Sequence, residues 1–185
     1  MCRGPVGLGA KRTRVLIFLN KDKRFCFIDT TVPTKSFIFV LKIKIIDFIN
    51  IPDSLNQRVL EKTIIDLVGS IGYSIEKLSY NFVSKQDMLK LNKNFLNHDT
   101  NTDIITFDYS LNNVLKAEIF ISMWAVETSA LDLNQSIENE TLRVVSHGVL
   151  HCMGFKDKTA KQIKAIREKE DEFIEMFHVK QKGNV

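Results

Sequence analysis

The stretch that most constrains this protein is residues 143–157, which read RVVSHGVLHCMGFKD. Its apolar residues recur at helical spacing, which predicts a buried helix. His147 and His151 are four residues apart, so on a helix their imidazoles lie on one face, about 6 Å apart along the axis. Gly154 predicts the end of this helix, because glycine adopts the left-handed cap conformation at little cost.

A third polar side chain follows the predicted helix end. If the chain doubles back at Gly154, Asp157 comes toward the two imidazoles. Two imidazoles, one carboxylate and one open position for water are typical of catalytic zinc. The spacing H-x3-H-x2-G-x2-D therefore predicts one zinc ion per chain at His147, His151 and Asp157. A pair of ordinary core histidines is the alternative.

The same spacing resembles the metzincin protease motif H-E-x-x-H-x-x-G-x-x-H. In those proteases the Glu after the first His is the general base, and here that position is Gly148. A metalloprotease is therefore disfavoured. Cys152, beside His151, points about 100° away from it on a helix, and we interpret it as a core residue.

Outward from this stretch, the apolar pattern predicts a layered fold. Capping residues are expected at Asp53, Ser84 and Thr159, the last two with a partner three residues on. The predicted class is α+β, a small mixed four-stranded sheet covered by about five helices. Strands are expected at 42–48, 78–82, 104–107 and 118–122, and helices at about 53–67, 84–91, 123–132, 138–152 and 159–177.

Composition separates the first forty residues from the rest of the 185-residue chain. Residues 1–40 hold eight Lys or Arg against two Asp, whereas the remainder holds 18 basic and 20 acidic residues. We interpret 1–40 as a basic, Phe-containing extension and 41–185 as the folded domain. The three cysteines lack paired spacing, which favours a reducing cytoplasm. The apolar runs near the N-terminus are too short to span a membrane.

Three blocks of the sequence, residues 147–155, 91–107 and 117–122, follow patterns of one known family. They resemble the YbeY family, the endoribonucleases of ribosomal RNA maturation. Residues 147–155 are similar to its H-G-x-L-H-L-x-G-Y-D-H signature, residues 91–107 to its L-N-x3-R-x2-D-x-P-T-D-V-L-S-F block, and residues 117–122 to its G-D-I-x-I-S strand. The resemblance covers about residues 42–178. It implies a metal-dependent single-strand endoribonuclease that acts in small-subunit ribosomal RNA maturation and ribosome quality control, with ribosomal RNA and the small ribosomal subunit as partners.

Three positions depart from the family pattern. Asp157 stands where the family has its third His, Leu96 where it has Arg, and Asn101 where it has Pro. Carboxylate oxygen also binds zinc, so the first change keeps a competent ligand. Arg143, one turn before His147, is a candidate catalytic replacement for the missing Arg, with an ordinary structural role as the alternative.

The remaining candidate residues would contact substrate. His98, Asp99 and Thr102 are expected to line the cleft, although Asp99 could equally be a turn residue. Lys156 and Lys158 follow the ligand turn and could attract phosphate, or simply face solvent. The rival function is a non-catalytic RNA-binding ribosome-assembly factor with a structural metal, which the loss of the family Arg at Leu96 favours.

We predict that deletion of residues 1–38 leaves folding and metal binding intact, because the periodic pattern and the motifs begin after them. Thermal unfolding of the full and shortened chains, each with and without zinc, checks this. A shortened chain with no cooperative transition would place the Phe-rich segments in the core.

Overall fold

A computed structural model describes residues 45–96 and 102–183. These belong to one compact unit, Ile43–Val185. The first residues of the predicted strand at 42–48 therefore lie outside the described ranges. The boundary predicted near residue 41 stays a prediction.

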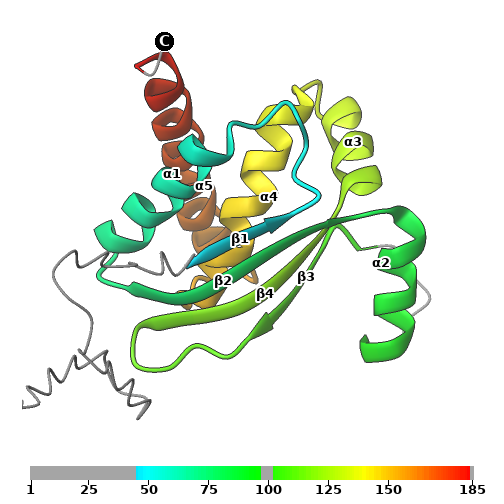
Figure 1. Cartoon of the computed structure of the whole chain (residues 1–185), viewed down its shortest axis with the longest axis horizontal. Coiled ribbons are helices and arrows are strands. Elements are labelled where there is room, and N and C mark those ends of the chain that lie inside the picture. Colours follow the sequence, from blue (N-terminus) through cyan, green and yellow to red (C-terminus); the bar gives the residue numbers. More distant parts are fainter. Residues whose placement is uncertain (1–44, 97–101, 184–185) are drawn as a thin grey trace, which may run out of the picture. The chain divides into compact units, whose positions relative to one another are not determined.

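The described residues form a four-stranded mixed sheet in the order β1-β2-β4-β3 (Figure 1). Strands β1 and β2 are parallel, as are β2 and β4, whereas β3 runs antiparallel to β4 at one edge. The predicted mixed sheet is confirmed. The strands are β1 (Ile46–Ile49), β2 (Ser74–Val83), β3 (Ile104–Asp108) and β4 (Val114–Ser122).

Five α-helices accompany the sheet in the described residues, as predicted, and the fold is α+β. A short π-helical segment, η1 (Asn92–Leu96), continues the second helix. The helices are α1 (Gln57–Ser70), α2 (Lys85–Leu91), α3 (Met123–Asp132), α4 (Ile137–Cys152) and α5 (Ala160–Lys182).

The helix caps differ from expectation at one place. Asp53 does not cap α1, because the Leu55 N–H donates to the Pro52 carbonyl and closes a turn first. Asn56 is the cap, and its side-chain oxygen accepts from the Arg58 and Val59 N–H groups at 3.1 and 3.2 Å. Ser84 caps α2 as predicted, and Thr159 forms the predicted capping box with Gln162 at the start of α5.

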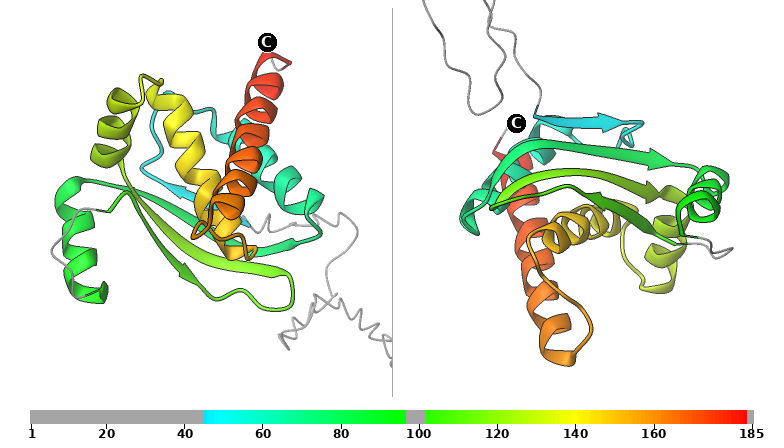
Figure 2. Two further views of the ribbon diagram at one scale, coloured as in Figure 1. Left: turned by 180° about the vertical axis from the view of Figure 1, so that it is seen from behind. Right: turned by 90° about the horizontal axis from the view of Figure 1, so that it is seen from below.

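One face of the sheet carries the core. Helix α5 packs against both α1 and α4, and Figure 2 shows these helices on the same side of the strands. The alternating apolar residues of β2 and β4 face this layer, because successive strand residues point to opposite faces. The largest fully buried side chains include Leu60, Ile64, Leu78, Tyr80, Ile119, Ile121, Phe173 and Phe177.

Helix α4 packs against side chains of the sheet at Gly148. A Cβ atom there would lie 2.7 Å from Ile104 Cδ1 and 3.3 Å from Ile119 Cγ2. The side of α4 at residue 148 therefore packs directly on β3 and β4. A glutamate at this position would point into the core, so the protease base is excluded by packing as well as by sequence. His147 is rotated by about 100° from Gly148 and faces away from this contact.

The longest helix, α5, has 23 residues, but its charged positions interrupt any apolar stretch. Within the described ranges, no helix has the length and apolar character required to span a bilayer.

We predict that Gly148→Ala destabilises the fold although alanine is the better helix former. The helical gain is about 0.5–1 kcal/mol. Ile104 Cδ1 is the end of a side chain and can rotate away, but Ile119 Cγ2, at 3.3 Å, belongs to a branched and fully buried side chain with little room to move, and overpacking of this kind costs about 1–3 kcal/mol. Gly69→Ala in α1 is the matched control, because a Cβ there has no neighbour within 4 Å. Urea unfolding should show the control at or above native stability and Gly148→Ala below it. Equal stabilisation by both changes would contradict the packing argument.

Candidate metal centre

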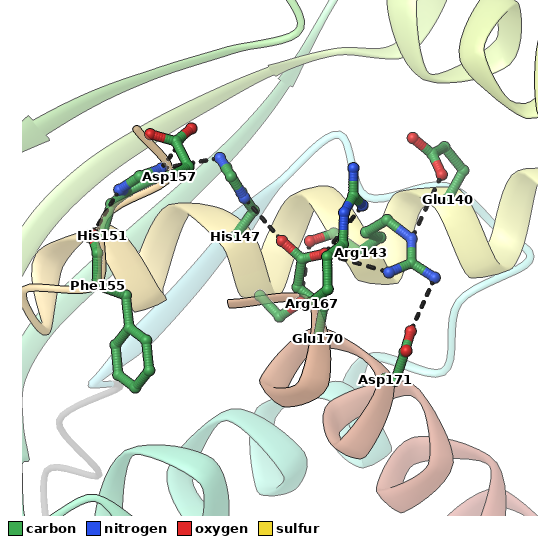
Figure 3. Close-up of polar contacts among 10 residues, drawn as sticks. Glu140, Arg143, His147, His151, Phe155, Asp157, Arg167, Glu170 and Asp171 are labelled. Carbon is green, nitrogen blue, oxygen red and sulfur yellow. Dashed lines mark hydrogen bonds and ion pairs between the residues drawn. The ribbon is translucent and has the colours of Figure 1, made fainter. Parts of the chain in front are cut away.

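The three residues predicted as metal ligands lie together at the C-terminal end of α4 (Figure 3). His147 Nε2 and His151 Nε2 are 2.9 Å apart, and an Asp157 carboxylate oxygen lies 3.8 Å from His151 Nε2. All three ligand atoms lie within 4.8 Å of one another. In the described part of the chain this is the one cluster of three or more such groups that could hold a metal ion.

The turn after α4 brings Asp157 into place. Gly154 adopts φ 87°, in the left-handed region where glycine is favoured, as predicted. Its N–H donates to the His151 carbonyl at 2.9 Å, and the Phe155 N–H donates to the Leu150 carbonyl at 3.1 Å. These bonds reverse the chain, so that residue 157 faces the helix it has just left.

The partners of the two Nδ1 atoms fix both imidazole tautomers. His151 Nδ1 lies 2.9 Å from the Phe155 carbonyl oxygen, which can only accept, so Nδ1 carries the hydrogen. His147 Nδ1 lies 2.7 Å from Glu170 Oε1, and an ionised carboxylate also only accepts. In both rings the lone pair is therefore on Nε2.

These tautomers make the site a good fit for a cation. Two Nε2 lone pairs at 2.9 Å repel each other unless a proton or a metal ion lies between them. The Asp157 carboxylate adds negative charge beside them. His151 and Asp157 are partly exposed, at 34% and 49%, so the site is open to solvent on one side. Neutral imidazole nitrogen and carboxylate oxygen form the ligand set that zinc accepts.

Behind His147 lies a buried group of charges. The Glu170 side chain is 1% exposed, and its Oε2 accepts from Arg143 Nη1 at 3.1 Å and Arg167 Nη1 at 3.0 Å. Burial alone would raise the pKa of Glu170, but the hydrogen bond from His147, the charge of Arg167 and the hydrogen bond from Arg143 together lower it. The carboxylate is therefore ionised, as the tautomer of His147 requires.

Arg143 is fully engaged with carboxylates. It contacts Glu170, Asp171 at 3.0 Å and, more loosely, Glu140 at 3.8 Å. Burial raises the pKa of Glu140, and the weak Arg143 contact offsets only part of that cost. The contacts of Arg143 correspond to the structural alternative stated above, and its catalytic role stays a prediction that they do not favour.

The predicted substrate residues differ in what the structure describes of them. Lys156 and Lys158 are exposed on the ligand turn. The Thr102 hydroxyl is 2.9 Å from the Asn92 side-chain nitrogen, so it already has a partner. His98 and Asp99 lie outside the described residues. Cys152 is buried, as predicted, and burial raises the pKa of its thiol to about 12, so it is no thiolate ligand.

Sequence reasoning missed two partners of the ligands, Glu170 and the Phe155 carbonyl. A signal for Glu170 was present, because Ile166, Phe173 and Phe177 place it on the apolar stripe of α5. An acidic residue within such a stripe requires a buried partner. The Phe155 carbonyl, a backbone group, leaves no such signal.

Comparisons with known proteins identify the family and agree with this fold. The family model described as "Endoribonuclease YbeY" matches residues 47–178. Endoribonuclease YbeY of Flavobacterium johnsoniae is 43% identical over 125 residues, covering 65% of this chain and 90% of that protein. The corresponding protein of Chlorobium limicola is 33% identical over 123 residues, covering 66% of this chain and 85% of that protein.

A solved structure shows the same architecture. The solution structure of a Thermotoga maritima protein superposes with a TM-score of 0.56 at 26% identity, covering 75% of this chain and 93% of that one. Fold and centre together define a small α+β protein with a histidine-histidine-aspartate cluster at a helix end. The chain belongs to the YbeY endoribonuclease family, as the sequence resemblance indicated.

We predict that Asp157→Ala lowers zinc affinity at least tenfold, because it removes the carboxylate, one of the three proposed ligands. Asp157→His should retain zinc, since imidazole is an equivalent ligand. Elemental analysis and zinc titration of the purified variants check this.

The Asp157→Asn variant tests whether Asp157 binds the metal ion or only caps the turn. Asparagine caps a turn as well as aspartate does, but lacks the anionic oxygen. The neighbouring helix cap is already supplied by Thr159 and Gln162. We therefore expect weakened zinc binding in the Asn variant. Full zinc retention in the Ala variant would refute Asp157 as a ligand.

Proposed function

We propose that this chain is a zinc-dependent endoribonuclease that cleaves single-stranded RNA and acts on small-subunit ribosomal RNA during maturation and quality control of the ribosome in the cytoplasm. Membership of the YbeY family supports the reaction class. The proposal that the site binds a metal ion rests on the Nε2 atoms of His147 and His151, which face each other at 2.9 Å beside Asp157. We assign one zinc ion per chain to His147, His151 and Asp157.

The protein groups prepare the site for phosphodiester cleavage. The Phe155 carbonyl and Glu170 hold the two rings with Nε2 free to bind. A zinc ion, when bound, would supply Lewis acidity toward a phosphoryl oxygen and lower the pKa of a bound water. RNA brings its own 2′-hydroxyl nucleophile, so the lack of a base at Gly148 does not prevent the reaction. Asp157 is half-exposed, so this side of the centre can be reached from solvent.

Local positive charge supports RNA as the substrate. Lys156, Lys158 and Lys161 lie on the turn and the first turn of α5, within a few residues of Asp157, and all three are exposed. No ion pair involves these three lysines within the described ranges, whereas Lys164 lies 3.9 Å from Glu168. Unpaired lysines beside a metal site attract the phosphate backbone without reading its sequence. We propose Lys156 and Lys158 as phosphate contacts.

The test is cleavage of an end-labelled single-stranded RNA by metal-stripped and zinc-loaded protein. We expect cleavage by the loaded native chain, and a loss of at least 100-fold in His147→Ala, because removal of a ligand nitrogen removes the metal. Lys62→Ala in α1 serves as a control for surface substitutions, since Lys62 lies outside the ligand turn.

A specific negative result would identify the rival function. If the zinc-loaded native chain is folded and binds RNA, yet cleaves no faster than His147→Ala, the chain is a non-catalytic assembly factor. The replacement of the family Arg by Leu96 would then be the sequence change to revert first.

A further inference from the structure

Glu170 is a buried acidic residue, so water does not stabilise the charge of its carboxylate. Its side chain is 1% exposed, and it lies on the same stripe of α5 as Ile166 and Phe173, which are 2% and 0% exposed. Burial of an unpaired carboxylate is strongly unfavourable, because the charge loses its hydration. A carboxylate that stays charged at such a position must therefore have partners that compensate for its lost hydration.

The partners of Glu170 divide between its two oxygens (Figure 3). Oε2 accepts from Arg143 and Arg167 at 3.1 and 3.0 Å, and Oε1 accepts from His147 Nδ1 at 2.7 Å. The two guanidinium groups hold the carboxylate in one orientation. That orientation directs the second oxygen at the imidazole of His147.

We propose that Glu170 is a positioning residue of the metal centre, which holds His147 in the Nδ1–H tautomer and aims its Nε2 lone pair at the cation. This inference rests on the proposed function, because it assumes that the cation is a metal. A carboxylate that accepts from a ligand histidine fixes the ring and increases the basicity of its other nitrogen. Arg143 and Arg167 act one step further away, by orienting Glu170.

The two histidines differ in how they are held. His151 donates to the Phe155 carbonyl, a backbone group that no substitution removes. His147 relies on a side chain from another helix, 23 residues later. A change at residue 170 should therefore affect one ligand and leave the other in place, which makes the role testable.

The chain provides a matched control beside Glu170. Asp171 contacts Arg143 at 3.0 Å and belongs to the same charge group, but its side chain is 66% exposed. Among the described contacts of Asp171, none reaches His147. Asp171→Asn thus perturbs the arginine without removing the hydrogen bond to the ligand.

The experiment measures two quantities on the full chain. The first is the dissociation constant for Co2+, followed by its visible absorption, for the native protein, Glu170→Gln and Asp171→Asn. We expect about a 10- to 100-fold loss in Glu170→Gln and less than a threefold change in Asp171→Asn. The second is the tautomer of His147 without metal, from imidazole 15N chemical shifts. We expect the Nδ1–H form in the native chain and a mixture in Glu170→Gln.

The outcomes separate this inference from the proposed function. Native-like Co2+ affinity and an unchanged His147 tautomer in Glu170→Gln would overturn the role of Glu170. A native chain that binds neither Co2+ nor Zn2+ would count against the metal centre, and the tautomer measurement would still decide the role of Glu170. If Glu170→Gln fails to fold, Glu170→Asp keeps the charge for the arginines but shortens the reach to His147. Native behaviour of that variant by both measures would likewise refute the proposal.

Discussion

The contact between α4 and the sheet at Gly148 determines where the rest of the site lies. With no side chain there, the helix backbone rests directly on Ile104 and Ile119, which fixes both its distance from β3 and β4 and its rotation about its own axis. The rotation of α4 about its axis matters most, because it turns the preceding residue, His147, away from the sheet. A larger residue at 148 would have to displace the side chains of Ile104 and Ile119 or the helix itself.

Much of this fold follows from local pattern. The helices and strands were predictable because each carries apolar residues at its own period, and the capping residues Ser84 and Thr159 act through neighbours three positions away. The cap of α1 was mispredicted, because the turn at Pro52 uses Asp53 and moves the start to Asn56. The strand order β1-β2-β4-β3 was not predictable, since pairing depends on contacts between segments far apart in the chain.

The same division holds within the site. His147, His151 and Asp157 belong to one helix and the turn that follows, so spacing alone brings them together. Glu170 arrives from α5 through tertiary packing, so its contacts with His147 and Arg143 cannot be derived from spacing, whereas its contact with Arg167, three residues earlier on the same helix, can. Arg143 illustrates the limit: its place one turn before His147 suggests catalysis, whereas its contacts are with the carboxylates behind the ligand.

The reversal at Gly154 has a consequence for how the protein can change over evolutionary time. Because it folds the ligand turn back on α4, the whole donor set is encoded in 11 consecutive residues, 147–157. Closing so short a loop costs little chain entropy, so the approach of Asp157 to the two histidines depends weakly on distant elements, whereas the orientation of the His147 ring also depends on Glu170. The surrounding strands and helices are then free to diverge in the surface they offer to RNA, while the chemistry stays with one compact segment.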